Sequence, residues 1–171
     1  MWFNNLYKKL KMKVLKFAKL LIFLDKNKKL FSGKNELGEL SKDPTEGNLI
    51  LNKYLHIGQM LYIAEYKKKL FDEDIICFLN GGVVLEIYKK WYQLIKEKEK
   101  NLTFEDKYTK FAEKLINILK NFKIIELIEI SHCDPSWKKA WSKIGKLKKE
   151  NKMENMENNS ETYKKIFKII E

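Results

Sequence analysis

A stripe of large apolar side chains in the second half of the chain constrains the fold more than any other feature. These side chains recur at alternating steps of four and three positions, at Phe104, Tyr108, Phe111, Leu115, Ile118 and Phe122. This spacing places them on one face of an α-helix, which is typical of a helix that packs on a core. Thr103 is a good N-cap, and Glu105 and Asp106 would lie near the positive end of the helix dipole. We therefore expect a core-facing helix over residues 104–122.

Similar periodicity along the rest of the chain indicates a mainly α-helical protein. The sequence has 171 residues, of which 44% are hydrophobic, and its two prolines and seven glycines are few for a turn-rich β protein. A chain of this length can bury one substantial core. We expect a compact bundle of about six to seven helices, with a short extended or β segment around residues 74–79. The other helices are predicted at 3–23, 49–67, from Val84 to the charge run 96–100, 124–131, 135–144 and 161–170.

Changes in composition divide the chain into three parts. We expect an N-terminal basic helix plus loop at 1–47, a helical core at 48–145, and a polar linker with a C-terminal helix at 146–171. The linker, rich in charged residues and asparagine, is expected to be mobile over 146–159. Ser160 would cap the last helix, which must dock on the body or on a partner because so short a helix is marginal alone.

The chain is strongly basic, yet all of its basic residues are lysines. The formal net charge is +12 at pH 7, and the sequence contains no arginine. Because arginine is preferred for bidentate recognition of phosphate and guanine, a solvated lysine surface is favoured over a dedicated polyanion site. The helix predicted at 3–23 leaves two alternatives. It is either a core helix with lysines on its outer face or a basic helix that lies on a membrane or a partner.

Other features favour a cytoplasmic location without a transmembrane segment. Cys77 and Cys133 do not form the kind of disulfide framework that small secreted domains use, and they fit a reducing compartment. The N-terminus lacks the shape of a signal peptide, since its apolar run at 20–24 is short and no small-residue cleavage site follows. No stretch approaches the roughly 18 apolar residues of a membrane span.

Three groups of chemically versatile residues have structural explanations. The acids at 72–74 lack partners at ligand spacing, and a carboxylate-rich turn explains them. His132 and Cys133 are adjacent, so on a helix they point about 100° apart and do not form a natural dyad. His56 is a lone histidine beside an apolar face, which indicates a packed side chain and not a ligand. We therefore expect no enzymatic activity, no metal site and no cofactor.

Two short blocks about fifty residues apart form junctions between helices. In the first, the apolar run within 74–79 predicts a strand, and Asn80, Gly81 and Gly82 predict a tight turn because such residues accept positive φ. In the second, Asp134 is expected to cap a new helix, with Pro135 at its first position.

Together these blocks resemble the Panacea domain, also called the SocA-like antitoxin domain. That family shows a helix of the form L-x-K-L-L-Y-x-A, then P-L-F-D-E-x-I-x-A-W-x-Y-G-P-V-V-x-x-V-Y, and later E-L-S-x-x-x-x-P-W. The matching segments here are HIGQMLYIA (56–64), LFDEDI (70–75), GGVV (81–84) with Tyr88, and ELIEISHCDPSW (126–137). The order and approximate spacing are kept within the core at 48–145. Gly82 replaces the usual proline, Phe78 stands where tryptophan is frequent, and the stretch from 64 to 70 is shorter.

The resemblance implies a mainly helical antitoxin that neutralises a toxin protein by binding it directly, without catalytic residues or a cofactor. The toxin is expected to be encoded by the adjacent gene, and the oligomeric state is left open. The alternatives are a nucleic-acid-binding protein that regulates its operon or belongs to a phage, and an adaptor that delivers a partner to a protease. The candidate partner contacts or motif positions are Asn80, Gly81, Gly82, Val83, Tyr88, Trp91, Asp134, Pro135 and Trp137.

Overall fold

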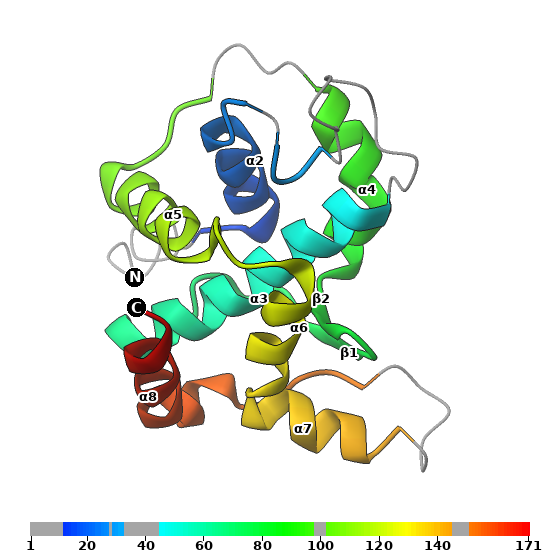
Figure 1. Cartoon of the computed structure of the whole chain (residues 1–171), viewed down its shortest axis with the longest axis vertical. Coiled ribbons are helices and arrows are strands. Elements are labelled where there is room, and N and C mark those ends of the chain that lie inside the picture. Colours follow the sequence, from blue (N-terminus) through cyan, green and yellow to red (C-terminus); the bar gives the residue numbers. More distant parts are fainter. Residues whose placement is uncertain (1–11, 28, 33–44, 98–101, 145–150) are drawn as a thin grey trace, which may run out of the picture.

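The computed structural model describes residues 12–27, 29–32, 45–97, 102–144 and 151–171. Within these ranges the protein is mainly helical, with one two-stranded hairpin, which confirms the predicted fold class (Figure 1). None of the helices in these ranges is both long enough and apolar enough to cross a membrane. The elements are α2 (Val14–Leu24), α3 (Thr45–Tyr66), β1 (Ile76–Phe78), β2 (Gly81–Val83), α4 (Leu85–Lys96), α5 (Asp106–Leu119), α6 (Ile124–His132), α7 (Pro135–Ser142), the short 3-10 helix η2 (Met156–Asn159) and α8 (Ser160–Ile170).

Helix α3 is the centre of the molecule. It contacts α2, α4, α5, α6, α8 and β2, and these elements lie around it in Figure 1. As a result every residue from 51 to 64 is buried. A helix that is surrounded on all sides must be apolar on several faces, and the predicted inward residues Leu51, Leu55 and Leu61 are buried accordingly.

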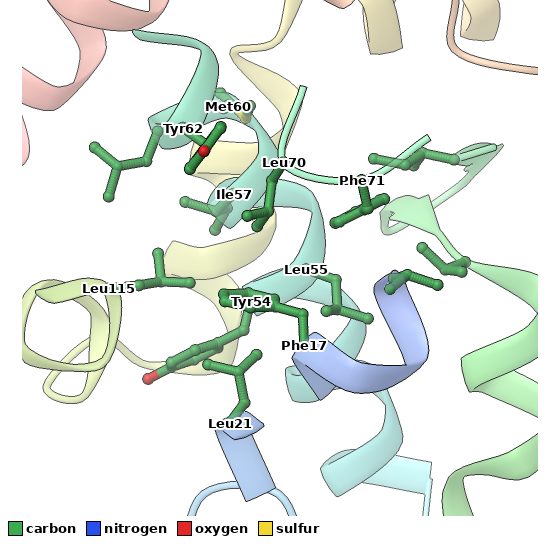
Figure 2. Close-up of a cluster of buried hydrophobic side chains, with 14 of the residues drawn as sticks. Phe17, Leu21, Tyr54, Leu55, Ile57, Met60, Tyr62, Leu70, Phe71 and Leu115 are labelled. Atoms are coloured by element: carbon green, nitrogen blue, oxygen red, sulfur yellow. The ribbon is translucent and has the colours of Figure 1, made fainter. Parts of the chain in front are cut away.

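The apolar core lies between α2, α3, α5 and the segment that follows α3. Phe17 and Leu21 of α2, Leu115 of α5 and Phe71 belong to this cluster, and all four side chains are fully buried (Figure 2). Burial of one such side chain stabilises the fold by about 1.5–3 kcal/mol. The described part of the first predicted helix is therefore a core helix, and its apolar face is not available to a membrane.

Gly58 allows the side chain of Leu115 on α5 to approach α3 closely. A Cβ atom at Gly58 would lie 2.9 Å from Cδ2 of Leu115. This is tighter than ordinary van der Waals contact, so a side chain at this position would have to displace the end of Leu115.

Two predicted helix boundaries in the N-terminal half were wrong. Met12 and Lys13 are not helical, and α2 begins only at Val14, while residues 1–11 lie outside the described part. Helix α3 begins at Thr45, four residues before the predicted start at residue 49. Asn48, just before the predicted start, lies within the helix, and its side-chain amide donates to the backbone oxygen of Tyr88 at 2.9 Å.

The predicted N-cap of α5 was also wrong. The helix begins at Asp106, and Glu105 occupies the N-cap position with extended backbone and no side-chain capping bond. Phe104 and Phe122 lie just outside the helix, yet both pack against the core. Apolar contacts of these flanking residues can thus extend the stripe beyond the helix itself.

The first junction is a β-hairpin. β1 pairs antiparallel with β2, and the register matches Phe78 with Gly81, so Leu79 and Asn80 form the two-residue loop. The predicted strand is confirmed, but Gly81 and Gly82 belong to β2 and not to the turn. Gly81 has a φ of 103°, which only glycine adopts readily.

The predicted mobile linker at 146–159 was wrong for its second part, while 145–150 lie outside the described residues. Lys152 forms an antiparallel bridge with Ile76, and the backbone N–H of Met153 donates to Ile75 at 2.8 Å. The side chains of Met153 and Met156 are buried. These contacts were hidden in the sequence because the apolar anchors are isolated methionines among polar residues.

Helix α8 docks on the body, against α3, with Tyr163 and Phe167 buried. Ser160 is its first residue, and Asn159 takes the N-cap position without a side-chain capping bond. The hydroxyl of Ser160 is buried and has no hydrogen-bond partner among the described residues. The predicted Ser160 cap was therefore wrong.

Candidate functional site

A row of polar side chains runs along the buried part of α3. Asn48, Asn52, His56 and Gln59 follow one another at steps of four, four and three residues, so they share one face of the helix. Lys53 adjoins this row. All five are buried, and each forms a hydrogen bond with another part of the chain or with its neighbour in the row. The row therefore fixes neighbouring segments against α3.

His56 and Asp134 form the centre of this polar row. Nε2 of His56 lies 2.8 Å from Oδ2 of Asp134, and the backbone N–H of Gly82 donates to Nδ1 of His56 at 3.0 Å. Because Nδ1 accepts this hydrogen bond, the neutral ring must carry its proton on Nε2. The Nε2–H group therefore donates a hydrogen bond to Asp134. Burial lowers the pKa of His56, although its bond to Asp134 acts in the opposite direction. The neutral ring thus connects the hairpin to the start of α7.

Asp134 caps α7, as predicted, and it also binds Tyr163 of α8, which was not predicted. Its Oδ1 accepts from the backbone N–H of Ser136 at 2.8 Å, which caps α7, with Pro135 at the first position. The same oxygen accepts the hydroxyl proton of Tyr163 from α8 at 2.7 Å. This fully buried carboxylate therefore connects α3, α7 and α8.

Lys53 and Asn52 hold the second strand of the hairpin. Nζ of Lys53 donates to the backbone oxygen of Gly82 at 2.9 Å, and Oδ1 of Asn52 accepts from the backbone N–H of Val84 at 2.9 Å. Lys53 is fully buried, and desolvation lowers its pKa to about 7. A Cβ atom on Gly81 would lie only 2.6 Å from this amine, so glycine is required where the strand passes Lys53.

The tip of the hairpin is held from its other side by the α6–α7 junction. The indole N–H of Trp137 donates to the backbone oxygen of Phe78 at 2.9 Å, and His132 lies 2.9 Å from the backbone oxygen of Leu79. The rings of His132 and Trp137 are stacked 3.9 Å apart. The backbone of the tip is thus fixed, while its side chains face outward.

A small pocket opens beside this fixed tip. It has a volume of about 240 Å³ and is lined by Leu49, Asn52, Phe78, Leu79, Asn80, Val83 and Tyr88. It therefore lies between the hairpin, the first part of α3 and the first turn of α4. Pockets for small-molecule ligands are usually about 300–1,000 Å³, so this pocket fits one large side chain better than a substrate.

Exposed apolar side chains lie at the pocket: Phe78, Leu79 and Tyr88 line it, and Tyr92 lies one helical turn beyond Tyr88. The exposed fractions are 38% for Phe78, 64% for Leu79, 51% for Tyr88 and 52% for Tyr92. We call these four residues and the pocket the hairpin surface. A cluster of exposed aromatic and aliphatic side chains on a rigid backbone is typical of protein-binding sites.

The predicted site residues fall into three groups in the structure. Asn80, Val83 and Tyr88 line the pocket. Gly81 and Gly82 are buried beneath it in β2, and Trp91 is buried on α4, where its indole N–H donates to the backbone oxygen of Phe31. The other three predicted residues, Asp134, Pro135 and Trp137, form the α6–α7 junction.

Four side chains with catalytic potential meet below the surface, but no substrate can reach them in this structure. Lys53, His56, Asp134 and Tyr163 each have an exposed fraction of 0%. Within the described ranges, no three or more histidine, cysteine, aspartate or glutamate side chains are grouped so that they could hold a metal ion. The hydrogen bonds of Lys53 and His56 instead fix the backbone of Gly82, which lies in the hairpin.

Sequence reasoning missed most of the polar row. His56 was treated as an isolated packed residue, and Asn48, Asn52, Lys53 and Gln59 were not singled out. A signal was nevertheless present, because polar residues at steps of four, four and three interrupt a long apolar helix. Tyr163 had no comparable signal, because only the fold brings α8 beside Asp134.

No protein-family model matches the chain, and neither a curated protein nor a solved structure gives a match.

Proposed function

We propose that this protein is an antitoxin-like protein-binding module that neutralises a partner toxin by forming a direct complex with it. The observation that supports this most is the hairpin surface, where exposed apolar side chains lie at a pocket on rigid backbone. The ordered motifs that resemble the Panacea domain supply the antitoxin class, and the toxin is expected to be encoded by the adjacent gene.

The placement of the motif residues fits a role in binding. His56 binds Gly82 of the hairpin and Asp134 of α7 within the fold, so these residues preserve the shape of the hairpin. Trp137 and His132 bind the backbone oxygens of Phe78 and Leu79. The side chains of Phe78 and Leu79 are therefore not needed to hold the hairpin tip, and they can contact a partner. A preorganised surface loses little conformational entropy on binding, which favours a tight complex.

The proposal is tested by co-expression with the product of the neighbouring gene. That product should arrest growth when expressed alone, and the native chain should restore growth and co-purify with it. A neighbouring product that is harmless alone, or one that stays toxic in the presence of this chain, would exclude the proposal.

Two matched tyrosine variants localise the interface. Tyr88→Ala should weaken the complex by about 10-fold or more, since truncating an aromatic anchor at an interface typically costs about 2 kcal/mol or more. Tyr66→Ala is the control, because Tyr66 is also 51% exposed but lies at the far end of α3. Equal affinities for both variants would place the interface elsewhere on the molecule.

A further inference from the structure

We infer that the partner segment which enters the hairpin surface is acidic and binds through its side chains, with one apolar side chain in the pocket and carboxylates beside Lys89 and Lys96. This inference rests on the proposed function and adds the chemistry of the partner to it. The observations that carry it are the charge pattern of α4, the occupied edges of the hairpin and the size of the pocket.

The outer face of α4 combines tyrosines with lysines. Successive residues of an α-helix are about 100° apart, so Tyr88, Lys89, Tyr92 and Lys96 lie within one side of the helix. All four are exposed. Nζ of Lys96 lies 4.3 Å from the ring centroid of Tyr92. The positive charges therefore adjoin the aromatic part of the hairpin surface directly.

The described carboxylates of α4 and its C-cap, Glu86 and Glu97, pair with other lysines. Glu86 pairs with Lys90 at 2.9 Å, and Glu97 pairs with Lys19 at 3.5 Å. Neither Lys89 nor Lys96 forms an ion pair with a carboxylate of the described residues. A partner that brings carboxylates to this face would gain charge complementarity and a faster encounter.

The hairpin does not offer a free edge to which a partner strand could be added. On the outer edge of β1, the backbone N–H of Cys77 donates to Asn151 and the backbone oxygen of Ile75 accepts from Met153, both at 2.8 Å. On the outer edge of β2, Lys53 and His56 bind the backbone of Gly82. Recognition by added backbone pairing is thus blocked, and a partner must use its side chains.

The pocket sets the size of the anchoring group. Its volume of about 240 Å³ lies below the usual range for small ligands, and its lining is mostly apolar, with Leu49, Phe78 and Val83 among the residues. One aliphatic or aromatic side chain would fill it. A protein partner fits this pocket better than nucleic acid does, because the chain has no arginine for phosphate recognition.

Charge reversal on α4 tests the inference. The variant is Lys89→Glu with Lys96→Glu, co-expressed with the toxin and then measured as a purified pair. The control is Lys165→Glu with Lys168→Glu on α8, which changes the net charge equally on two exposed residues of another helix. Circular dichroism on both variants checks that the helical fold is retained.

We expect the α4 variant to weaken the complex by about 10-fold or more, chiefly through a slower association rate that depends on salt. The α8 control should stay within about 2-fold of the native chain. If the native chain neutralises the toxin and the α4 variant binds as tightly as the control, the inference is wrong while the proposed function stands. If the native chain does not neutralise the toxin, the proposed function fails and the inference falls with it.

A single-stranded DNA probe of roughly 20 nucleotides separates protein from nucleic-acid recognition at this face. We expect only weak binding that both double variants reduce alike, because it would reflect overall charge. Tight binding that the α4 variant alone abolishes would overturn the inference in favour of a nucleic-acid partner.

Discussion

Lys53 shows at the scale of one residue how the interior accommodates a group that sequence patterns assign to the surface. Its side chain is fully buried, and its amine donates a hydrogen bond to the backbone oxygen of Gly82. A buried ammonium ion is costly, and the protein reduces this cost by lowering the pKa of Lys53 to about 7. The amine is therefore partly neutral near physiological pH.

This shift predicts how stability changes with pH. The unfolded chain keeps Lys53 protonated up to its ordinary pKa near 10.5, whereas the folded chain loses the proton around pH 7. Between these values the unfolded state binds more protons, so the free energy of unfolding must rise with pH. From about pH 7 to about pH 8.5 we expect a gain of about 1.5 kcal/mol in urea unfolding.

Lys53→Met is the matching variant, because it keeps the volume and removes the titrating group. Its free energy of unfolding should stay nearly constant over the same pH range. Burial also raises the pKa of the Cys77 thiol from 9.0 to about 11, so ionisation of this thiol in the unfolded chain lowers the free energy of unfolding above about pH 9. The pH range of the experiment ends below that value. A native chain whose stability does not change between these two pH values would contradict the assigned environment of Lys53.

At the scale of elements, the hairpin depends on glycine for reasons that differ from those at Gly58. Gly81 combines a φ of 103° with contacts to the side chains of Ser131 and Lys53 that leave no room for a Cβ atom. Gly58 lies in regular α-helix, and its hypothetical Cβ would meet the flexible end of one leucine at 2.9 Å. The two positions therefore respond differently to the same substitution.

We predict that Gly81→Ala lowers the free energy of unfolding by more than about 2 kcal/mol, because strain in φ adds to a collision. Gly58→Ala should change it by less than about 1 kcal/mol, because the gain in helix propensity offsets the shift of Leu115. Urea denaturation of both variants measures this difference. Similar losses at the two positions would show that the hairpin is not constrained as described.

At the scale of the whole molecule, the C-terminal segment belongs to the folded body. Residues 151–153 extend the hairpin as a third strand-like partner, and α8 places the hydroxyl of Tyr163 on Asp134. Four buried side chains, those of Met153, Met156, Tyr163 and Phe167, attach the segment to the core. The segment thus connects the hairpin, α7 and α3.

A chain that ends at residue 150 should therefore lose its cooperative thermal transition. Removing four buried side chains forfeits about 6–12 kcal/mol of apolar burial, which is comparable to the whole stability of a typical domain. Thermal unfolding followed by circular dichroism measures this. Ile169→Ala is the control and should melt like the native chain, because Ile169 is 84% exposed. A truncated chain with a near-native melting temperature would mean that the segment is only an appendage.

Local signals in the sequence were reliable where a single element satisfies them. The apolar stripe of α5, the strand at β1 and the Asp134–Pro135 helix start were all found. Predictions failed where a distant partner overrides a local preference. Asn48 precedes the helix predicted at 49–67 but lies in α3, where its side chain binds the backbone of Tyr88. Of the candidate residues at the hairpin, Asn80, Val83 and Tyr88 line the pocket, and the sequence could not separate them from Gly81 and Gly82, which are buried in β2.

The sequence by itself determined the helical class, because the periodicity of apolar residues is a property of neighbouring positions. Only the tertiary structure decided which polar residues are buried, because each of them needs a partner from another part of the chain. His56 requires both Gly82 and Asp134, and Asp134 in turn requires Tyr163 from the last helix. These long-range bonds fix the hairpin whose exposed side chains form the candidate site, so that surface exists only in the folded chain.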